Sequence, residues 1–180
     1  AMPDIDEVFG PDVTVSLNIA AKQACDVPFM TAFCASLGET GLAERFVLEL
    51  TEEAFFTTGR FQSEVLPKIR AIGARVSIDD FGVGYSSLAA LADITADELK
   101  IDRSFITDID KRPRSQIVLK AIESLGAALG MTVVAEGVET FEEVAYLLGA
   151  TQIRCAQGYY FARPLLLDQI RQAQPPRVSG

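Results

Sequence analysis

Acidic side chains and one lysine stand at the ends of short apolar runs in several separate parts of the chain. These residues are Glu49, Asp79, Asp80, Lys100 and Glu136. A buried strand has no structural use for a charge at its exit, because burying an unpaired charge is costly. If such carboxylates gathered on one face of a sheet, they could hold hard metal ions and act on a phosphate ester.

The sequence contains no histidine among its 180 residues. This absence removes the commonest general base and the usual zinc ligand. Any chemistry at the carboxylates must therefore use oxygen ligands and a lysine. One alternative uses the lysine alone: Lys100 would form a Schiff base with a carbonyl substrate, which requires a desolvated amine with a lowered pKa.

Composition limits the class of protein and its partners. The chain is 49% hydrophobic, enough for one buried core, and contains no apolar stretch of the ~20 residues that a membrane span needs. The net charge of -9 argues against DNA binding by this domain and against an anionic membrane surface. Cys25, Cys34 and Cys155 are odd in number and form no C-x-x-C pair. We therefore expect a cytoplasmic protein without a disulfide framework or a signal peptide.

Strand-like runs rich in β-branched residues alternate with helical patterns along most of the chain. The predicted strands are residues 13–19, 46–50, 75–78, 98–101, 132–135 and 152–155. This alternation is typical of a parallel α/β fold, and the lack of a dinucleotide fingerprint favours a (β/α) barrel resembling triosephosphate isomerase. About six strands in place of eight indicate a barrel that is incomplete at the N-terminus. The expected division is an N-terminal remnant at 1–12, a partial barrel at 13–170 and a frayed tail at 171–180.

The sequence indicates where two of the predicted helices begin or end. Pro28 suits the first turn of a helix that would end near Gly38. Thr140 and Glu143 have the spacing of a capping box, in which each residue's side chain binds the backbone N–H of the other. The second pair places a helix start shortly after Glu136.

The segment 79–88, with the sequence DDFGVGYSSL, places two adjacent carboxylates before a glycine-rich loop. Neighbouring residues on a strand point to opposite faces, but the backbone turns at the exit, so both carboxylates could converge on one pair of metal ions. Alternatively, Asp80 caps the next turn, while Gly82 and Gly84 only permit a positive φ. The glycines match neither a dinucleotide fingerprint nor a P-loop.

Each remaining candidate also has a purely structural interpretation. Glu49 lies inside an apolar run, where a carboxylate must be paired or metal-bound. Asn18 could be a neutral oxygen ligand or a turn residue, and Glu136 could also belong to a plain turn. Lys100 could form an ordinary ion pair with Asp102. Taken together, five successive strands that end in such residues are improbable for chance surface positions.

Six short motifs, whose order and spacing span nearly the whole chain, resemble the EAL-domain family of bacterial cyclic di-GMP phosphodiesterases. They are residues 16–20 (SLNIA), 49–52 (ELTE), 79–88 (DDFGVGYSSL), 99–106 (LKIDRSFI), 133–140 (VVAEGVET) and 157–164 (QGYYFARP). The resemblance implies a TIM-like barrel that hydrolyses cyclic di-GMP to linear pGpG with two Mg²⁺ or Mn²⁺ ions. The residues that match the family's metal ligands are Asn18, Glu49, Asp79, Asp80 and Glu136.

The resemblance also implies roles around the metal ions. Lys100 would orient the attacking water and act in catalysis with Glu136, and Glu52 would hold the glycine-rich loop. The loop residues in question are Phe81, Gly82 and Gly84. The expected contacts to the guanine side of the substrate are Gln157 and Gly158.

The chain departs from the family pattern before Asn18, because no Glu-Ala-Leu motif precedes it, and Glu7 lies in an acidic segment without strand character. The loop also has Val83 where a threonine is usual. We therefore expect impaired hydrolysis and a homo-oligomer formed through an unpaired sheet edge. The alternative function is a receptor or interaction module that binds cyclic di-GMP, or a protein partner, without cleaving anything.

Overall fold

The computed structural model describes residues 2–56, 59–84, 95–166 and 169–170. Six strands in this part of the chain form one parallel sheet in the order β1-β2-β3-β4-β5-β6. They are β1 (Val15–Ile19), β2 (Phe46–Thr51), β3 (Arg75–Phe81), β4 (Glu98–Ile101), β5 (Thr132–Ala135) and β6 (Cys155–Ala156). The predicted α/β fold is confirmed, and each of the six predicted strands overlaps one of these strands. The predicted tail at 171–180 and the loop residues 85–88 lie outside the described residues.

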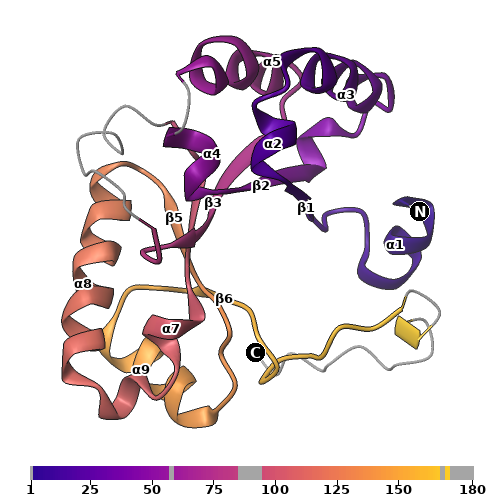
Figure 1. The fold of residues 1–180 in the computed structure, drawn as a ribbon. Helices are drawn as coiled ribbons and strands as arrows, with labels where there is room; N and C mark the ends of the chain where they lie inside the picture. The colour runs from indigo at the N-terminus through magenta and orange to yellow at the C-terminus, as the bar shows by residue number, and fades with distance from the viewer. Residues whose placement is uncertain (1, 57–58, 85–94, 167–168, 171–180) are drawn as a thin grey trace.

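In the described residues, helices connect β1 to β2, β2 to β3, β4 to β5 and β5 to β6, and they cover the outer side of the curved sheet, as in a TIM-like barrel (Figure 1). The longer ones are α1 (Met2–Phe9), α3 (Val27–Glu39), α5 (Leu66–Ala71), α8 (Pro113–Ala128) and α9 (Phe141–Ala150). The shorter ones are α2 (Ala21–Ala24), η1 (Ala43–Arg45), α4 (Glu52–Phe56), η2 (Phe61–Val65), α7 (Arg103–Ile106) and η3 (Ile109–Lys111). No helix in the described ranges is long and apolar enough to cross a membrane.

The strands bury apolar side chains on the outer face of the sheet, under the helices. Leu48, Leu50, Val76, Ile78, Leu99 and Ile101 are all fully buried. Because side chains alternate between the two faces of a strand, the residues between these positions point into the barrel. Glu49, Ser77 and Lys100 are three such inward positions. The apolar packing thus fixes which polar side chains meet inside.

Helix α3 begins as predicted but ends slightly later. The carboxylate of Asp26 accepts the N–H of Phe29 at 3.0 Å, and Pro28 lies in the first turn. The helix continues past Gly38 to Glu39. A Cβ at Gly38 would lie 3.1 Å from Cγ2 of Ile72, so this glycine allows close packing rather than ending the helix.

Strand β6 begins three residues later than predicted, at Cys155, while β1 starts at Val15 rather than at residue 13. The delay in β6 has a local cause. The hydroxyl of Thr151 accepts the N–H of Ile153 at 3.1 Å, and the guanidinium of Arg154 donates to the carbonyl oxygens of both residues. These bonds form a turn that keeps residues 151–154 out of the ladder.

The N-terminal segment forms helix α1, which precedes the sheet. The guanidinium of Arg45 donates to both carboxylate oxygens of Asp6, at 3.1 and 2.6 Å, and to the carbonyl oxygen of Val13 at 3.2 Å. This bidentate ion pair and the bond to Val13 hold α1 against η1 and against the residues that precede β1. Glu7 belongs to this helix and is exposed. The division at residue 12 stays a prediction.

Candidate active site

The ammonium group of Lys100 is surrounded by three carboxylates from neighbouring strands. Its Nζ atom lies 2.9 Å from Oε2 of Glu49, 3.0 Å from Oδ1 of Asp79 and 2.6 Å from Oε1 of Glu136. The lysine side chain is only 5% exposed. Its predicted alternative partner, Asp102, instead caps α7 by accepting the N–H of Ser104 at 2.9 Å. Lys100 is therefore part of the inner site and not a surface ion pair.

The electrostatics of Lys100 favour its charged form. Burial lowers its pKa, but the hydrogen bonds to Glu136, Glu49 and Asp79 together outweigh burial, so its pKa is raised. A protonated amine carries no lone pair with which to attack a carbonyl. The Schiff-base alternative is therefore not supported by this environment.

Asp79 and Asp80 converge although they are neighbours on one strand. Asp80 has φ +53°, so the backbone leaves the extended conformation at this residue. Side-chain oxygens of Asp79, Asp80 and Glu136 consequently lie within 4.8 Å of one another. This is the convergent arrangement expected from the sequence, and the strand exit creates it.

The carboxylates carry unbalanced negative charge. Burial raises the pKa of Asp80, and the charges of Asp79 and Asp102 raise it further. Burial also raises the pKa of Glu136, although Lys100 opposes this effect. A divalent cation would relieve the repulsion, and oxygen ligands alone suit Mg²⁺ or Mn²⁺. The donor set therefore fits a site for such ions.

Asn18 and Glu49 lie beside each other at the carboxyl end of the sheet, because the β1–β2 register pairs them directly. Asn18 is exposed, whereas Glu49 is 7% exposed. Lys100 engages one oxygen each of Glu49, Asp79 and Glu136. Among the described residues, Lys100 leaves the second oxygen of each carboxylate for a further ligand.

Gln157 and Gly158 lie against the loop that follows β5. The Nε2 atom of Gln157 donates to Oε1 of Glu136 at 2.5 Å. The carbonyl oxygen of Gln157 accepts the N–H of Val138 at 3.1 Å. A Cβ at Gly158 would lie 2.2 Å from the carbonyl oxygen of Val138, so only glycine allows this approach. Gln157 is thereby brought beside the acidic cluster.

Glu52 lies under the start of the glycine-rich loop. It is 5% exposed, and its Oε2 accepts the N–H of Gly82 at 3.3 Å. A Cβ at Gly84 would lie 2.9 Å from Oε1 of Glu52. Phe81 is buried at the end of β3. Glu52 thus contacts the described part of the loop, and its role in holding the loop stays a prediction.

Some side chains that shape the site were not predicted. Phe105 packs against Gly82, where a Cβ would come within 2.8 Å of its ring. Gly137 lies on Arg103, whose Cβ would be 2.4 Å from an added Cβ. The only sequence signal was that Phe105 lies in a motif and that a glycine follows Glu136. Neither signal identifies the opposing residue, because each contact joins distant segments.

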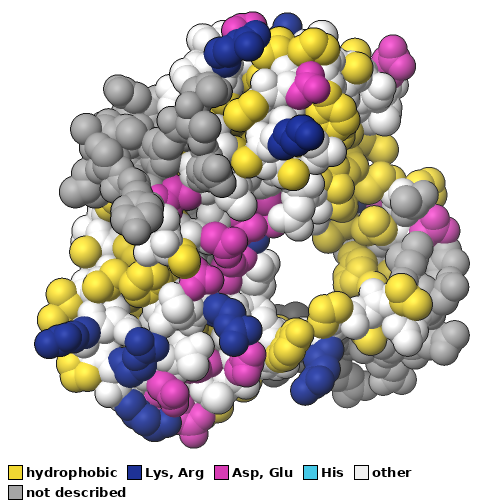
Figure 2. Space-filling view, in the orientation of Figure 1, with side chains coloured by type: hydrophobic (Ala, Val, Ile, Leu, Met, Phe, Trp, Pro, Cys, Tyr) yellow, Lys and Arg dark blue, Asp and Glu magenta, His cyan; other side chains and the backbone are white. Residues whose placement is uncertain are grey.

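Acidic side chains gather beside the central opening of the molecule (Figure 2). Apolar side chains line other parts of the rim. The exposed apolar residues on the segment after β6 include Tyr159, Tyr160, Phe161, Leu165 and Leu166. The carboxylate cluster is therefore approached from the inside of the curved sheet.

Together, the parallel α/β layers and the carboxylate–lysine cluster at the strand ends define a barrel-type protein with a site suited to divalent metal ions. The family model for the EAL domain matches residues 1–164. The chain therefore belongs to the EAL domain family.

Three relatives illustrate this membership. The cyclic di-GMP phosphodiesterase PdeR of Escherichia coli is 38% identical over 157 residues, which make up 87% of this chain and 24% of PdeR. The EAL domain of Mycobacterium smegmatis DcpA is 30% identical with a TM-score of 0.84, covering 95% of this chain and 77% of that one. Klebsiella pneumoniae BlrP1, in a complex with manganese and cyclic di-GMP, is 31% identical with a TM-score of 0.81, covering 92% and 43%. The chain thus spans about a quarter of the length of PdeR.

Proposed function

We propose that this chain is the metal-binding part of a phosphodiesterase domain that hydrolyses cyclic di-GMP to pGpG. The observation that carries the proposal is the contact of Lys100 with Glu49, Asp79 and Glu136 at the ends of adjacent strands. The name of PdeR and the ligands of BlrP1 support the same substrate. Metal-assisted hydrolysis of a phosphodiester is the reaction to which a protonated lysine and a set of oxygen ligands are best suited.

Two Mg²⁺ or Mn²⁺ ions are the proposed cofactors. The residues that would hold them are Asn18, Glu49, Asp79, Asp80 and Glu136. When bound, the ions would neutralise the phosphate and lower the pKa of a coordinated water.

The remaining residues would position water and substrate. Lys100 stays protonated, and its three N–H groups face Glu49, Asp79 and Glu136 in this structure. Its ammonium would hold a water molecule by donating to it in place of one of these carboxylates, and would stabilise negative charge on the phosphate. Glu136 faces the same volume and can accept a hydrogen bond from that water. Gln157 and Gly158 would contact a guanine, while Glu52 would hold the loop that begins at Phe81.

The test is to incubate the chain with cyclic di-GMP and Mn²⁺ or Mg²⁺ and to measure pGpG by chromatography. We expect pGpG from the unaltered chain and none from Asp79→Asn. A matched control is Asp110→Asn on η3, which lies outside the cluster and should retain activity. Equal turnover in the unaltered chain and in Asp79→Asn would exclude this site as the source.

The alternative is a receptor that binds cyclic di-GMP without cleaving it. It is supported by the ion pairs of Lys100, whose ammonium is engaged by three carboxylates in this structure. In such a receptor, Lys100 would serve mainly as the counter-ion of Glu49, Asp79 and Glu136. Calorimetric binding of cyclic di-GMP with no pGpG after prolonged incubation in Mn²⁺ would establish the receptor.

We also propose a cytoplasmic location, self-association and no DNA binding. The net charge of -9 disfavours a nucleic-acid surface. Self-association is supported by the described sheet order, in which β1 and β6 each have a neighbour on one side only. Sedimentation would measure the oligomeric state, and a titration with duplex DNA at low salt should show no binding.

A further inference from the structure

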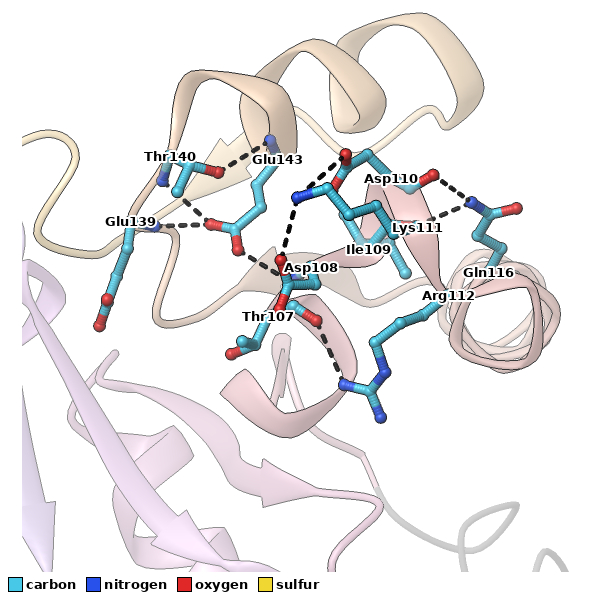
Figure 3. Close-up of polar contacts among 10 residues, drawn as sticks. All are labelled: Thr107, Asp108, Ile109, Asp110, Lys111, Arg112, Gln116, Glu139, Thr140 and Glu143. Carbon is cyan, nitrogen blue, oxygen red and sulfur yellow. Dashed lines mark hydrogen bonds and ion pairs between the residues drawn. The ribbon is translucent and has the colours of Figure 1, made fainter.

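Helix α9 contacts two loops, one of which begins at the acidic cluster. One loop is residues 136–140, which follow β5 and begin with Glu136. The other contains Asp108, between α7 and η3. Figure 3 shows the carboxylate of Glu143 pointing from the first turn of α9 toward both loops.

Glu143 is a buried acid with three backbone donors. Its Oε2 accepts the N–H groups of Glu139 at 2.8 Å and Thr140 at 3.1 Å, while its Oε1 accepts the N–H of Asp108 at 3.0 Å. Its side chain belongs to a residue that is 3% exposed. Hydrogen bonds to an ionised acceptor are stronger than neutral ones, and water does not compete in a buried position.

The capping box explains only part of this arrangement. The hydroxyl of Thr140 accepts the N–H of Glu143 at 3.3 Å, and Oε2 of Glu143 accepts the N–H of Thr140 in return. The bond from Asp108 to Oε1 joins segments 35 residues apart and has no place in a capping box. Glu143 therefore has a second structural role, because its Oε1 connects α9 with the loop after α7.

Asp108 holds an unusual backbone conformation at this contact. Its φ is +53°, in the left-handed region that non-glycine residues seldom adopt. Its side chain faces the surface, where it pairs with Lys111 at 3.2 Å, while its backbone N–H points to Glu143. The buried carboxylate thus compensates for a strained turn and fixes its direction.

The loop 136–140 is held on its other side by the segment after β6. The N–H of Val138 donates to the carbonyl oxygen of Gln157 at 3.1 Å, and the carbonyl oxygen of Val138 accepts the N–H of Tyr160 at 3.0 Å. Between these bonds and Glu136, Gly137 packs directly on Arg103 of α7. The loop that presents Glu136 is therefore fixed between α7, the segment after β6 and Glu143.

We propose that Glu143 is a positioning residue that sets the place of Glu136 relative to Lys100 by tying the loop after β5 to the loop after α7. Its consequence for turnover rests on the proposed phosphodiesterase function. Its consequence for loop order and metal affinity does not. Glu143 touches neither Lys100 nor the metal ligands in this structure, so it acts only through the loop.

The variant Glu143→Gln separates the capping of α9 from the bond between Glu143 and Asp108. The single amide oxygen of glutamine can still accept the N–H groups of Glu139 and Thr140 and preserve the cap. Its amide NH₂ would then face the N–H of Asp108, and two donors cannot bond. Thr140→Ala is the matched control, because it removes the cap hydroxyl but leaves the carboxylate bond to Asp108 intact.

The experiment compares both variants with the unaltered chain by amide exchange at Asp108 and Glu139, by Mn²⁺ titration and by pGpG kinetics. For Glu143→Gln we expect faster exchange at Asp108, a several-fold loss of Mn²⁺ affinity and a larger fall in kcat than rise in KM. The loss of affinity should be smaller than the roughly 10–100-fold typical of a group bonded directly to a metal ligand. Thr140→Ala should lower the melting temperature and leave Mn²⁺ affinity unchanged.

The proposal is overturned if Glu143→Gln matches the unaltered chain in exchange at Asp108 and in Mn²⁺ affinity. It is also overturned if Thr140→Ala lowers Mn²⁺ affinity as much as Glu143→Gln does, because helix capping alone would then explain the effect. If the unaltered chain binds Mn²⁺ but forms no pGpG, the phosphodiesterase proposal fails. Exchange and Mn²⁺ affinity still decide the role of Glu143 in that case.

Discussion

Nζ of Lys100 lies 2.6 Å from Oε1 of Glu136, and the two side chains are 5% and 13% exposed. The same oxygen also accepts the hydrogen bond from Gln157. Lys100 touches one oxygen of Glu136 and leaves the other, so the ion pair and a metal ligand can coexist on one carboxylate. This arrangement lets a protonated lysine remain beside bound cations.

Hydrolysis by this chain should require Mg²⁺ or Mn²⁺ and should be suppressed by Ca²⁺. Ca²⁺ accepts larger and looser coordination than either ion, and it polarises water less. Initial rates of pGpG formation in each ion, with EDTA as the control, test this expectation. Full turnover in EDTA would show that the carboxylates do not work through a metal.

Asp79→Asn and Lys100→Met should fail in different ways. Asparagine has a single acceptor oxygen and cannot bridge two ions, so Asp79→Asn should lose both Mn²⁺ binding and turnover. Lys100→Met should lose turnover but keep Mn²⁺ binding, because Glu49 and Glu136 remain. Without metal, Lys100→Met should be less stable by about 3–5 kcal/mol, the typical result of removing one partner of a buried ion pair. Equal loss of Mn²⁺ in both variants would contradict the role assigned to Lys100.

The stability of the metal-free chain should respond to Glu136 in the mildly acidic range. The pKa of Glu136 is raised in the folded state, so the folded chain binds more protons than the unfolded chain just above the ordinary pKa of 4.5. Stability from this group therefore falls as pH rises through that window. Glu136→Gln should remove this part of the pH dependence in denaturant titrations performed in EDTA. An identical pH profile in the variant would show that Glu136 titrates normally.

The positions of the carboxylates could be predicted approximately, because ionisable residues that end apolar runs lie at or near the carboxyl ends of buried strands. Glu49 and Asp79 lie inside β2 and β3, and Glu136 directly follows β5. The same rule places Lys100 near the end of β4 from the sequence alone. It could not locate the bond between Glu143 and Asp108, which depends on the path of two loops and on a left-handed turn without glycine. The late start of β6 was missed for a similar reason, since the hydrogen bonds of Thr151 compete locally with the strand.

Gly158→Ala should abolish activity and destabilise the chain, whereas Gly149→Ala should do neither. A Cβ at Gly158 would lie 2.2 Å from the backbone of Val138, so the segment with Gln157 would have to move away from Glu136. Gly149 is exposed within α9, and nothing lies within 4 Å of an added Cβ. Helix propensity then predicts that Gly149→Ala stabilises by up to about 1 kcal/mol. Thermal melts and pGpG assays of both variants measure the contrast.

The open edges of the described sheet should promote self-association. In the described sheet, β1 and β6 have unpaired outer edges, and such edges favour pairing with another chain. Large apolar side chains are exposed after β6, including Tyr159 at 55%, Phe161 at 50% and Leu166 at 74%. We therefore expect the 180-residue chain to self-associate.

A version extended at its N-terminus by a strand carrying Glu-Ala-Leu should be more stable and more active. The added strand would pair with β1, and its glutamate would supply an oxygen ligand beside Asn18 and Glu49. The matched control carries Gln-Ala-Leu, which gives the same strand without the carboxylate. Both extensions should reduce self-association in sedimentation, but only the glutamate version should raise pGpG formation. A stable monomer whose activity is unchanged by either extension would show that the open sheet needs no further strand.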